Sequence, residues 1–162
     1  MYKATRDFIA ARQSHTEFRL QTPTVKRIGG GEANKCFENA MAIVNQGKAE
    51  GVKYVALSGW LVQPYDKEKN CTAIIQHWWN GDESGNQFDT SPLINDNEEY
   101  VLDFALYEFI RANFEQIKSN VAMSLLYQNN QFEVLLNHET MEFRQLPALK
   151  TEFLFRYETN VD

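Results

Sequence analysis

The spacing of apolar residues predicts a helix over about residues 35–50. Four residues recur at helical intervals and so share one face: Cys36, Ala40, Ile43 and Val44. Asn34 is placed to cap the first turn with its side chain, and Gly51 is the residue type that commonly ends a helix. Cys36 is therefore expected in the first turn of this helix.

Three strands are predicted after this helix, over residues 54–62, 72–80 and 86–90. The first is apolar on both faces, which is typical of a central strand. A polar loop containing Pro64 separates the first two strands, and residues 81–85 form the turn before the third. Upstream, the pattern predicts a short helix over 5–12, a short edge strand around 18–20, and a flexible loop at Gly29, Gly30 and Gly31.

The chain beyond residue 92 predicts a long helix followed by strands. Asn95, Asp96 and Asn97 are cap-type residues, and we expect a mostly buried helix from about 100 to 118 behind them. Residues 121–127 fit either a continuation of that helix or a strand. Further strands are predicted over three short segments: residues 132–136, 141–145 and 152–157.

These elements predict an α+β fold, with the cysteine-bearing helix packed on a mostly antiparallel sheet. A chain of 162 residues is long enough for one core, and neither a repeat nor a linker divides it. We therefore predict a single domain over residues 1–162. Its C-terminal helix and strands are expected over about residues 96–157.

Composition and charge narrow the classes of function. The formal net charge of -6 argues against a nucleic-acid partner, because phosphate backbones are bound by basic surfaces. Two cysteines, Cys36 and Cys71, are too few for a disulfide framework, and no apolar run resembles a signal peptide or a membrane span. We expect a cytoplasmic protein without a membrane partner. Clustered metal ligands and a phosphate-binding loop are both missing, so no metal or cofactor is expected.

Cys36, His77 and Asp89 form the candidate chemistry of the chain. A cysteine nucleophile needs an imidazole to move protons and a carboxylate to orient that imidazole. Cys36 lies at a helix start, where the dipole favours a thiolate and unpaired N–H groups point outward. Those N–H groups, with the Asn34 side chain as a helper, are candidates for binding an oxyanion.

The predicted hairpin places His77 opposite Asp89. If the turn is symmetric about Glu83, His77 and Asp89 are directly paired, with Cβ atoms roughly 4.5–5.5 Å apart. Cys71 lies six residues from His77 on the same strand, which is roughly 20 Å, too far for proton transfer. We interpret Cys71 as a small buried hydrophobe. Cys36 itself also fits a purely structural role, since cysteine is often buried.

Four segments together resemble the transglutaminase-like branch of the papain-like cysteine enzymes. They are Cys36-Phe-Glu-Asn-Ala, Tyr54-Val-Ala-Leu-Ser-Gly-Trp60, His77-Trp78-Trp79 and Phe88-Asp89-Thr90, and they cover about residues 30–92. The resemblance implies a helix packed on an antiparallel sheet, with Cys36 as nucleophile, His77 as base and Asp89 as orienting acid. It also implies that Trp60 or Trp78 lines the cleft. Thr90 follows Asp89 directly, where the family usually has a proline.

The leading hypothesis is a cysteine-dependent acyl-transfer enzyme that acts on an amide. The amide belongs to a peptide bond, an isopeptide bond or a glutamine side chain of a peptide or protein substrate, and the sequence leaves hydrolase and transferase open. The alternative is a non-catalytic binding module on the same scaffold, with Trp78 or Trp79 anchoring a partner. A third hypothesis makes the C-terminal strands an interaction surface.

Overall fold

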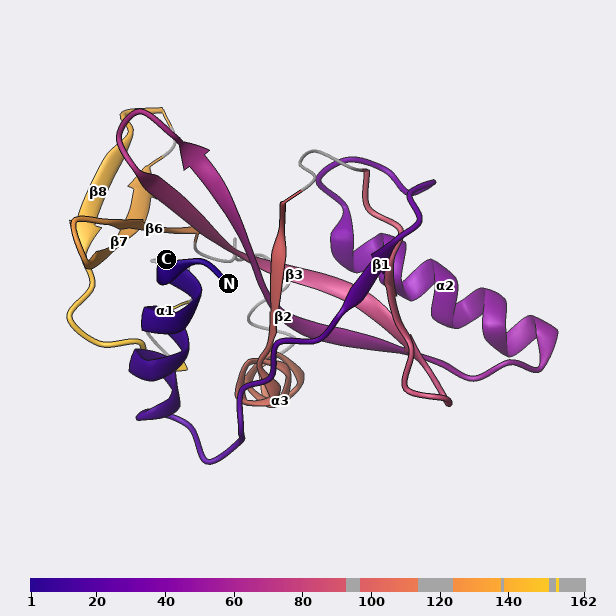
Figure 1. Cartoon of the computed structure of the whole chain (residues 1–162). Helices are drawn as coiled ribbons and strands as arrows, with labels where there is room; N and C mark the ends of the chain where they lie inside the picture. Colours follow the sequence, from indigo (N-terminus) through magenta and orange to yellow (C-terminus); the bar gives the residue numbers. More distant parts are fainter. Residues whose placement is uncertain (93–96, 114–123, 138, 152–153, 155–162) are drawn as a thin grey trace, which may run out of the picture.

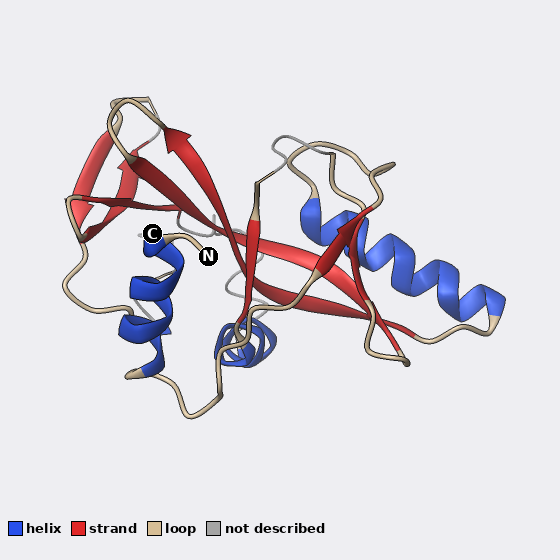
Figure 2. Ribbon diagram, viewed as in Figure 1, coloured by secondary structure: helices blue, strands red, loops and turns tan. Residues whose placement is uncertain are grey.

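A mostly antiparallel sheet runs through the molecule, and helices pack against it (Figures 1 and 2). The computed structural model describes residues 1–92, 97–113, 124–137, 139–151 and 154. The helices of this part of the chain are α1 (Lys3–Gln13), α2 (Cys36–Glu50) and α3 (Phe104–Ala112). Its strands are β1 (Val25–Arg27), β2 (Tyr54–Asp66), β3 (Cys71–Asp82), β4 (Gln87–Asp89), β5 (Glu99–Leu102), β6 (Ser124–Gln128), β7 (Gln131–Asn137) and β8 (Glu142–Gln145). The architecture therefore agrees with the predicted α+β class.

The long strand β3 organises the sheet. One edge of β3 pairs with β2 along its whole length. The other edge is shared, because β6 pairs with residues 72–75 and β4 pairs only with Asn80 and Gly81. Residues 76–79 lie between these two ladders. His77 is therefore placed at a break along one edge of β3.

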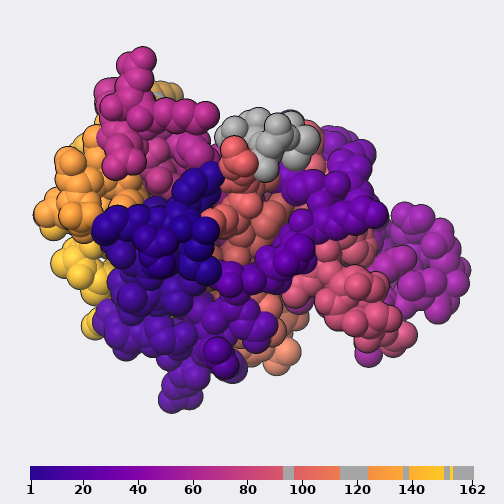
Figure 3. Space-filling view, viewed as in Figure 1, coloured from indigo at the N-terminus to yellow at the C-terminus, as the bar shows by residue number. Residues whose placement is uncertain are grey.

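Helix α2 and the strands β6, β7 and β8 lie at opposite ends of the β2–β3 hairpin (Figure 1). In Figure 1, α2 lies at the end where β2 starts and β3 finishes, whereas β6, β7 and β8 lie at the other end. The space-filling view in Figure 3 shows the segment between α1 and α2 crossing the face that carries β4 and β5. In the described part of the chain, no helix combines the length and apolar character that crossing a membrane requires.

The two faces of the hairpin carry different apolar clusters. The larger cluster includes Trp60 and Trp78, and Phe8 of α1 packs edge-on to Trp60 at 5.4 Å. The smaller cluster contains Leu61, Trp79, Tyr100 and Leu102. Side chains alternate along a strand, so His77 belongs to the face of Trp79, and Trp78 belongs to the opposite face.

The predicted N-terminal helix and the helix over 35–50 are confirmed, but the cap of the second is wrong. Lys35 occupies the N-cap position of α2, and no side chain bonds there. Asn34 lies one residue earlier in a left-handed conformation with φ 58°. Gly51 ends the helix as predicted, with φ 73° and with the Val52 amide bonded to the Gly47 carbonyl at 2.8 Å.

The helix predicted over about 100–118 is confirmed over residues 104–112 but begins later than expected. Residues 99–102 form β5, which pairs with residues 59–62 of β2, and the helix begins only at Phe104. Asp103 caps it, because its side chain accepts the Leu106 amide. The apolar residues Tyr100 and Leu102 fit the alternation of a strand as well as the spacing of a helix. Pairing with β2 stabilises the strand. Asn95 and Asp96 lie outside the described residues, as do residues 152–153 and 155–157 of the last predicted strand.

Three further elements differ from expectation or were left open. Residues 18–20 form no strand, and only Gln21 makes an isolated bridge, to Leu102. β2 continues through Pro64 to Asp66 instead of ending at residue 62. Proline is tolerated there because β5 pairs with β2 only up to Val62, which leaves one edge of β2 free beyond it. Residues 124–128 form strand β6.

Candidate active site

His77 and Asp89 are hydrogen-bonded, although their register differs from the prediction. The pairing of β3 with β4 sets Asn80 opposite Phe88, two residues away from the expected register. A shift of two residues preserves the face of every side chain, so His77 and Asp89 still meet as diagonal neighbours. The distance from His77 Nε2 to Asp89 Oδ2 is 2.8 Å, and the two residues are 7% and 1% exposed.

Three further groups hold the Asp89 carboxylate in place. The Tyr100 hydroxyl donates to Asp89 Oδ2 at 2.7 Å, and the Ser91 amide donates to Oδ1 at 2.8 Å. Arg27 Nη1 donates to the Tyr100 oxygen at 2.9 Å and lies 3.8 Å from Asp89 Oδ2. Arg27 also pairs with Glu98. Tyr100 is not among the site residues predicted from the sequence, because a helix is predicted there. In strand β5, Tyr100 pairs with Leu61 and shares the sheet face of His77.

These contacts make Asp89 a strongly acidic carboxyl. Burial disfavours the ionised form, but the hydrogen bond and charge of His77 and the bonds from Ser91 and Tyr100 outweigh it. Together they lower the pKa of Asp89 from 3.8 to about 2. Burial and the neighbouring Asp89 charge raise the pKa of Tyr100, so this phenol stays protonated and remains a donor. Asp89 is thus a permanent anion at neutral pH.

The same environment makes His77 a strong base. Burial opposes its protonation, but hydrogen bonds with Asp89 and with Cys36, together with the charges of these groups, raise the pKa of His77 from 6.5 to about 9. His77 is therefore protonated at neutral pH. Cys36, one of the causes of this shift, begins α2, the helix that a hydrogen bond from Asn80 holds next to β3.

The start of α2 is fixed over the sheet by Asn80. The side-chain amide of Asn80 donates to the Ala40 carbonyl of α2 at 2.9 Å, one helical turn after Cys36. Phe37 packs edge-on to Trp78 with ring centroids 5.1 Å apart. Cys36 itself is half-buried against the larger apolar cluster.

The glycine segment before α2 is held against the end of β4. The Gly31 amide donates to the Thr90 carbonyl at 2.7 Å, one residue after Asp89. The side chain of Asn39 pairs with both backbone groups of Glu32, at 2.8 and 3.0 Å. A Cβ at Gly31 would come within 2.7 Å of Asn39 and the Thr90 carbonyl, so this approach needs glycine. The loop thereby ties Cys36 to the strand that carries Asp89.

The other predicted site residues have different places. Asn34 is exposed and caps nothing. Trp60 is completely buried, and its Nε1 donates to Asp103 Oδ2 at 3.0 Å, so it is a core residue and not a cleft wall. Trp78 is 7% exposed and packs between Phe37 and Tyr107, where it supports α2. Trp60 and Trp78 share the face opposite His77.

Burial also bears on the rival hypotheses. Trp79 is buried at 1% exposure, whereas Trp78, at 7% exposure, lines a hollow of about 340 Å³ together with Phe37 and Tyr107. Cys71 is buried on β3, as predicted, and burial raises the pKa of its thiol. Among the described residues, no group of three or more His, Cys, Asp or Glu side chains is arranged to hold a metal ion.

The His77–Asp89 pair is expected to make stability depend on pH in both directions. The raised pKa of His77 contributes stability that is complete below 6.5 and lost as pH rises through about 9. The lowered pKa of Asp89 contributes stability present above 3.8 and lost as pH falls through about 2. Urea denaturation between pH 5 and 9 should show a loss of about 3 kcal/mol that the His77→Gln variant lacks. An identical pH slope in both proteins would contradict the assignment.

Comparisons of the chain with protein-family models, curated proteins and solved structures find no match.

Proposed function

We propose that the protein is a cysteine-dependent acyl-transfer enzyme that acts on an amide through Cys36, His77 and Asp89. The observation that carries this proposal is the bond of 2.8 Å between His77 and Asp89, on strands that pack beside the start of α2, where Cys36 lies. A thiol, an imidazole and a carboxylate in this order form the constellation that a cysteine nucleophile requires. The amide belongs to a peptide bond, an isopeptide bond or a glutamine side chain.

The proposed reaction begins with His77 protonated. Because its pKa is about 9, the imidazolium is the resting form and is the partner that a Cys36 thiolate needs. The sulfur attacks the amide carbonyl carbon, and its electrons move onto the carbonyl oxygen. Collapse of this intermediate breaks the C–N bond, and the amine leaves with the proton of His77. Since Nε2 is bonded to Asp89, Nδ1 is the nitrogen that exchanges this proton.

The second half of the reaction returns the enzyme to its starting state. Neutral His77 takes a proton from water or from an amine, which then attacks the thioester carbonyl and displaces the sulfur. Asp89 keeps the ring oriented throughout and balances its charge, as the carboxylate of a triad does. Water as the acceptor makes the protein a hydrolase, and an amine makes it a transferase.

The arrangement of elements supports the same proposal at the level of the fold. The cysteine starts a helix, the histidine lies on a long antiparallel strand, and the aspartate ends the next strand. This order and packing are those implied by the resemblance to transglutaminase-like enzymes of the papain-like group. We include that core, over about residues 30–92, in the proposal.

Alkylation of Cys36 by iodoacetamide tests whether His77 makes the Cys36 thiol more reactive. We expect Cys36 in the intact protein at pH 7 to react at least about tenfold faster than the thiol of an unstructured peptide, because a thiolate is the reactive species. His77→Ala should remove most of this excess rate. The measurement is the second-order rate constant from mass spectrometry, with buried Cys71 as the internal reference. A Cys36 rate equal to that of the peptide would favour the non-catalytic binding module.

A further inference from the structure

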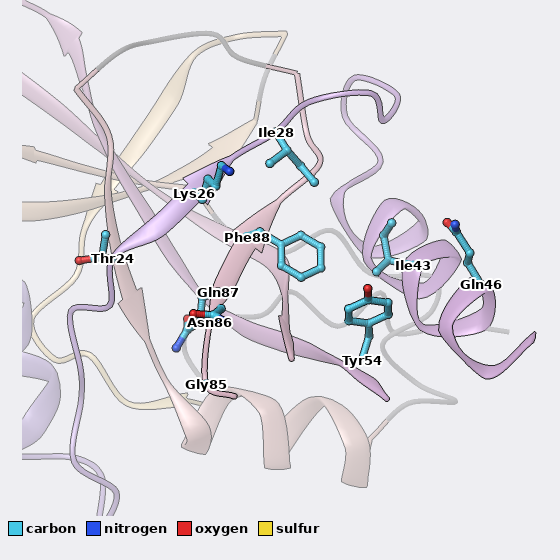
Figure 4. A pocket seen from close by; sticks show the side chains of 10 residues that line it. All are labelled: Thr24, Lys26, Ile28, Ile43, Gln46, Tyr54, Gly85, Asn86, Gln87 and Phe88. Atoms are coloured by element: carbon cyan, nitrogen blue, oxygen red, sulfur yellow. The ribbon is translucent and has the colours of Figure 1, made fainter. Parts of the chain in front are cut away.

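A large hollow lies beside α2, on the side of β1 and β4. Its volume is about 790 Å³, and Cys36, His77 and Asp89 are not among the residues that line it. Four partly uncovered apolar side chains from different parts of the chain form its walls: Ile28, Ile43, Tyr54 and Phe88 (Figure 4). We call this hollow the β1–α2 groove. Its apolar walls fit a ligand with an apolar side chain.

Lys26 is the charged side chain among the described residues that line the groove. It pairs with Phe88 in the parallel β1–β4 ladder, so both side chains lie on the groove face. Lys26 is exposed, and the ion pairs found among the described residues do not include it. The lining therefore combines an apolar floor with a cation that pairs with no carboxylate in the described part of the chain. This combination is complementary to an apolar group next to a negative charge.

The groove and the candidate active site share two elements. Ile43 follows Cys36 by seven residues on α2, which corresponds to a rise of about 10 Å along the helix. Phe88 directly precedes Asp89 on β4, so the two side chains lie on opposite faces of that strand. An extended peptide advances about 3.3 Å per residue, so about three residues cover the rise between Cys36 and Ile43.

We propose that the β1–α2 groove binds the acyl-transfer substrate, and that this substrate is a peptide in which a large apolar residue is next to an acidic one. The acidic residue is the farther of the two from the reacting amide. The apolar residue enters the groove about three residues from the reacting amide, and the carboxylate pairs with Lys26. This inference rests on the proposed function, because it needs Cys36 as the nucleophile. It names the substrate class of the same site.

Iodoacetylated peptides test the proposal with the intact protein. One probe carries the iodoacetyl group on the N-terminus of Gly-Gly-Leu-Glu-amide, and a second carries it at the C-terminal end of Glu-Leu-Gly-Gly, so both chain directions are covered. Controls replace leucine by serine or glutamate by lysine. We expect one direction to alkylate Cys36 at least about tenfold faster than its controls, since burying a leucine side chain contributes about 1.5–3 kcal/mol.

Charge reversal at Lys26 provides the decisive comparison. Lys26→Glu should invert the preference between the glutamate and lysine peptides. Lys67→Glu, at an exposed lysine in the turn between β2 and β3, should leave both this preference and the rate with plain iodoacetamide unchanged and is the matched control. Equal rates for all peptides in both directions, or no effect of Lys26→Glu, would overturn the groove assignment. A slow reaction of Cys36 with plain iodoacetamide would instead overturn the proposed function.

Discussion

Replacing Asp103 with alanine is expected to lower the free energy of unfolding by about 3–5 kcal/mol, because it leaves a buried cation without its partner. Asp103 and Arg12 are both completely buried, and Arg12 Nε lies 2.8 Å from Asp103 Oδ2. The same carboxylate accepts the Trp60 indole at 3.0 Å and the Leu106 amide at 3.1 Å. One substitution therefore removes an ion pair, a bond to a core indole and the cap of α3.

The loss should spread beyond α3 because Arg12 connects distant parts of the chain. Its guanidinium also donates to the Leu149 carbonyl at 2.7 Å and to the Thr151 hydroxyl at 2.6 Å. An unpaired Arg12 would move toward solvent, and its hydrogen bonds to Leu149 and Thr151 and the packing of α1 would weaken with it. Urea denaturation measures the effect as a lower midpoint, provided that the slope of the transition stays the same.

A double substitution separates the buried charge from the rest of the loss. The pair Arg12→Met and Asp103→Leu removes both charges together, and it should recover a large part of the stability lost in Asp103→Ala, because an apolar pair carries no desolvation penalty. The helix cap and the bond to Trp60 stay missing in this variant. If Asp103→Ala loses less than about 1 kcal/mol, the buried ion pair does not hold the fold as described.

Replacing Cys36 with alanine is expected to abolish formation of a covalent acyl-enzyme. p-Nitrophenyl acetate is a suitable probe, because a reactive thiolate takes its acetyl group and releases p-nitrophenolate. We expect a burst of one equivalent of p-nitrophenolate and one acetyl group on Cys36, identified by mass spectrometry of the intact protein. Removing a nucleophile typically lowers the catalysed rate by a factor of about 10⁴ or more.

The second cysteine supplies the matched control for this experiment. Cys71→Ala should keep the full burst, since Cys71 is buried six residues from His77 on β3. Asp89→Asn should keep part of the burst, because the amide holds the ring but does not balance its charge. Circular dichroism of each variant checks that the fold is intact. A full burst in Cys36→Ala would refute the proposed nucleophile.

Local sequence determined the elements that depend on short-range pattern. The helical spacing after Cys36 and the glycine at position 51 were enough to predict a helix over residues 35–50. The observed helix α2 begins one residue later, at Cys36, and ends at Glu50. The alternation of side chains along β3 and β4 was enough to place His77 and Asp89 on one face. The predicted register was wrong by two residues, but His77 and Asp89 still lie on the same face, because every second side chain of a strand points to the same side of the sheet.

Only the tertiary structure decided the features that depend on distant partners. Residues 99–102 became a strand because β2 offers a ladder at residues 59–62, and this brought Tyr100 to Asp89. Trp60 became a core residue because Asp103, which is 43 residues away, accepts its indole. Spacing along the chain carries no information about such pairs, since their energies arise from burial and hydrogen bonding that exist only after the chain has folded.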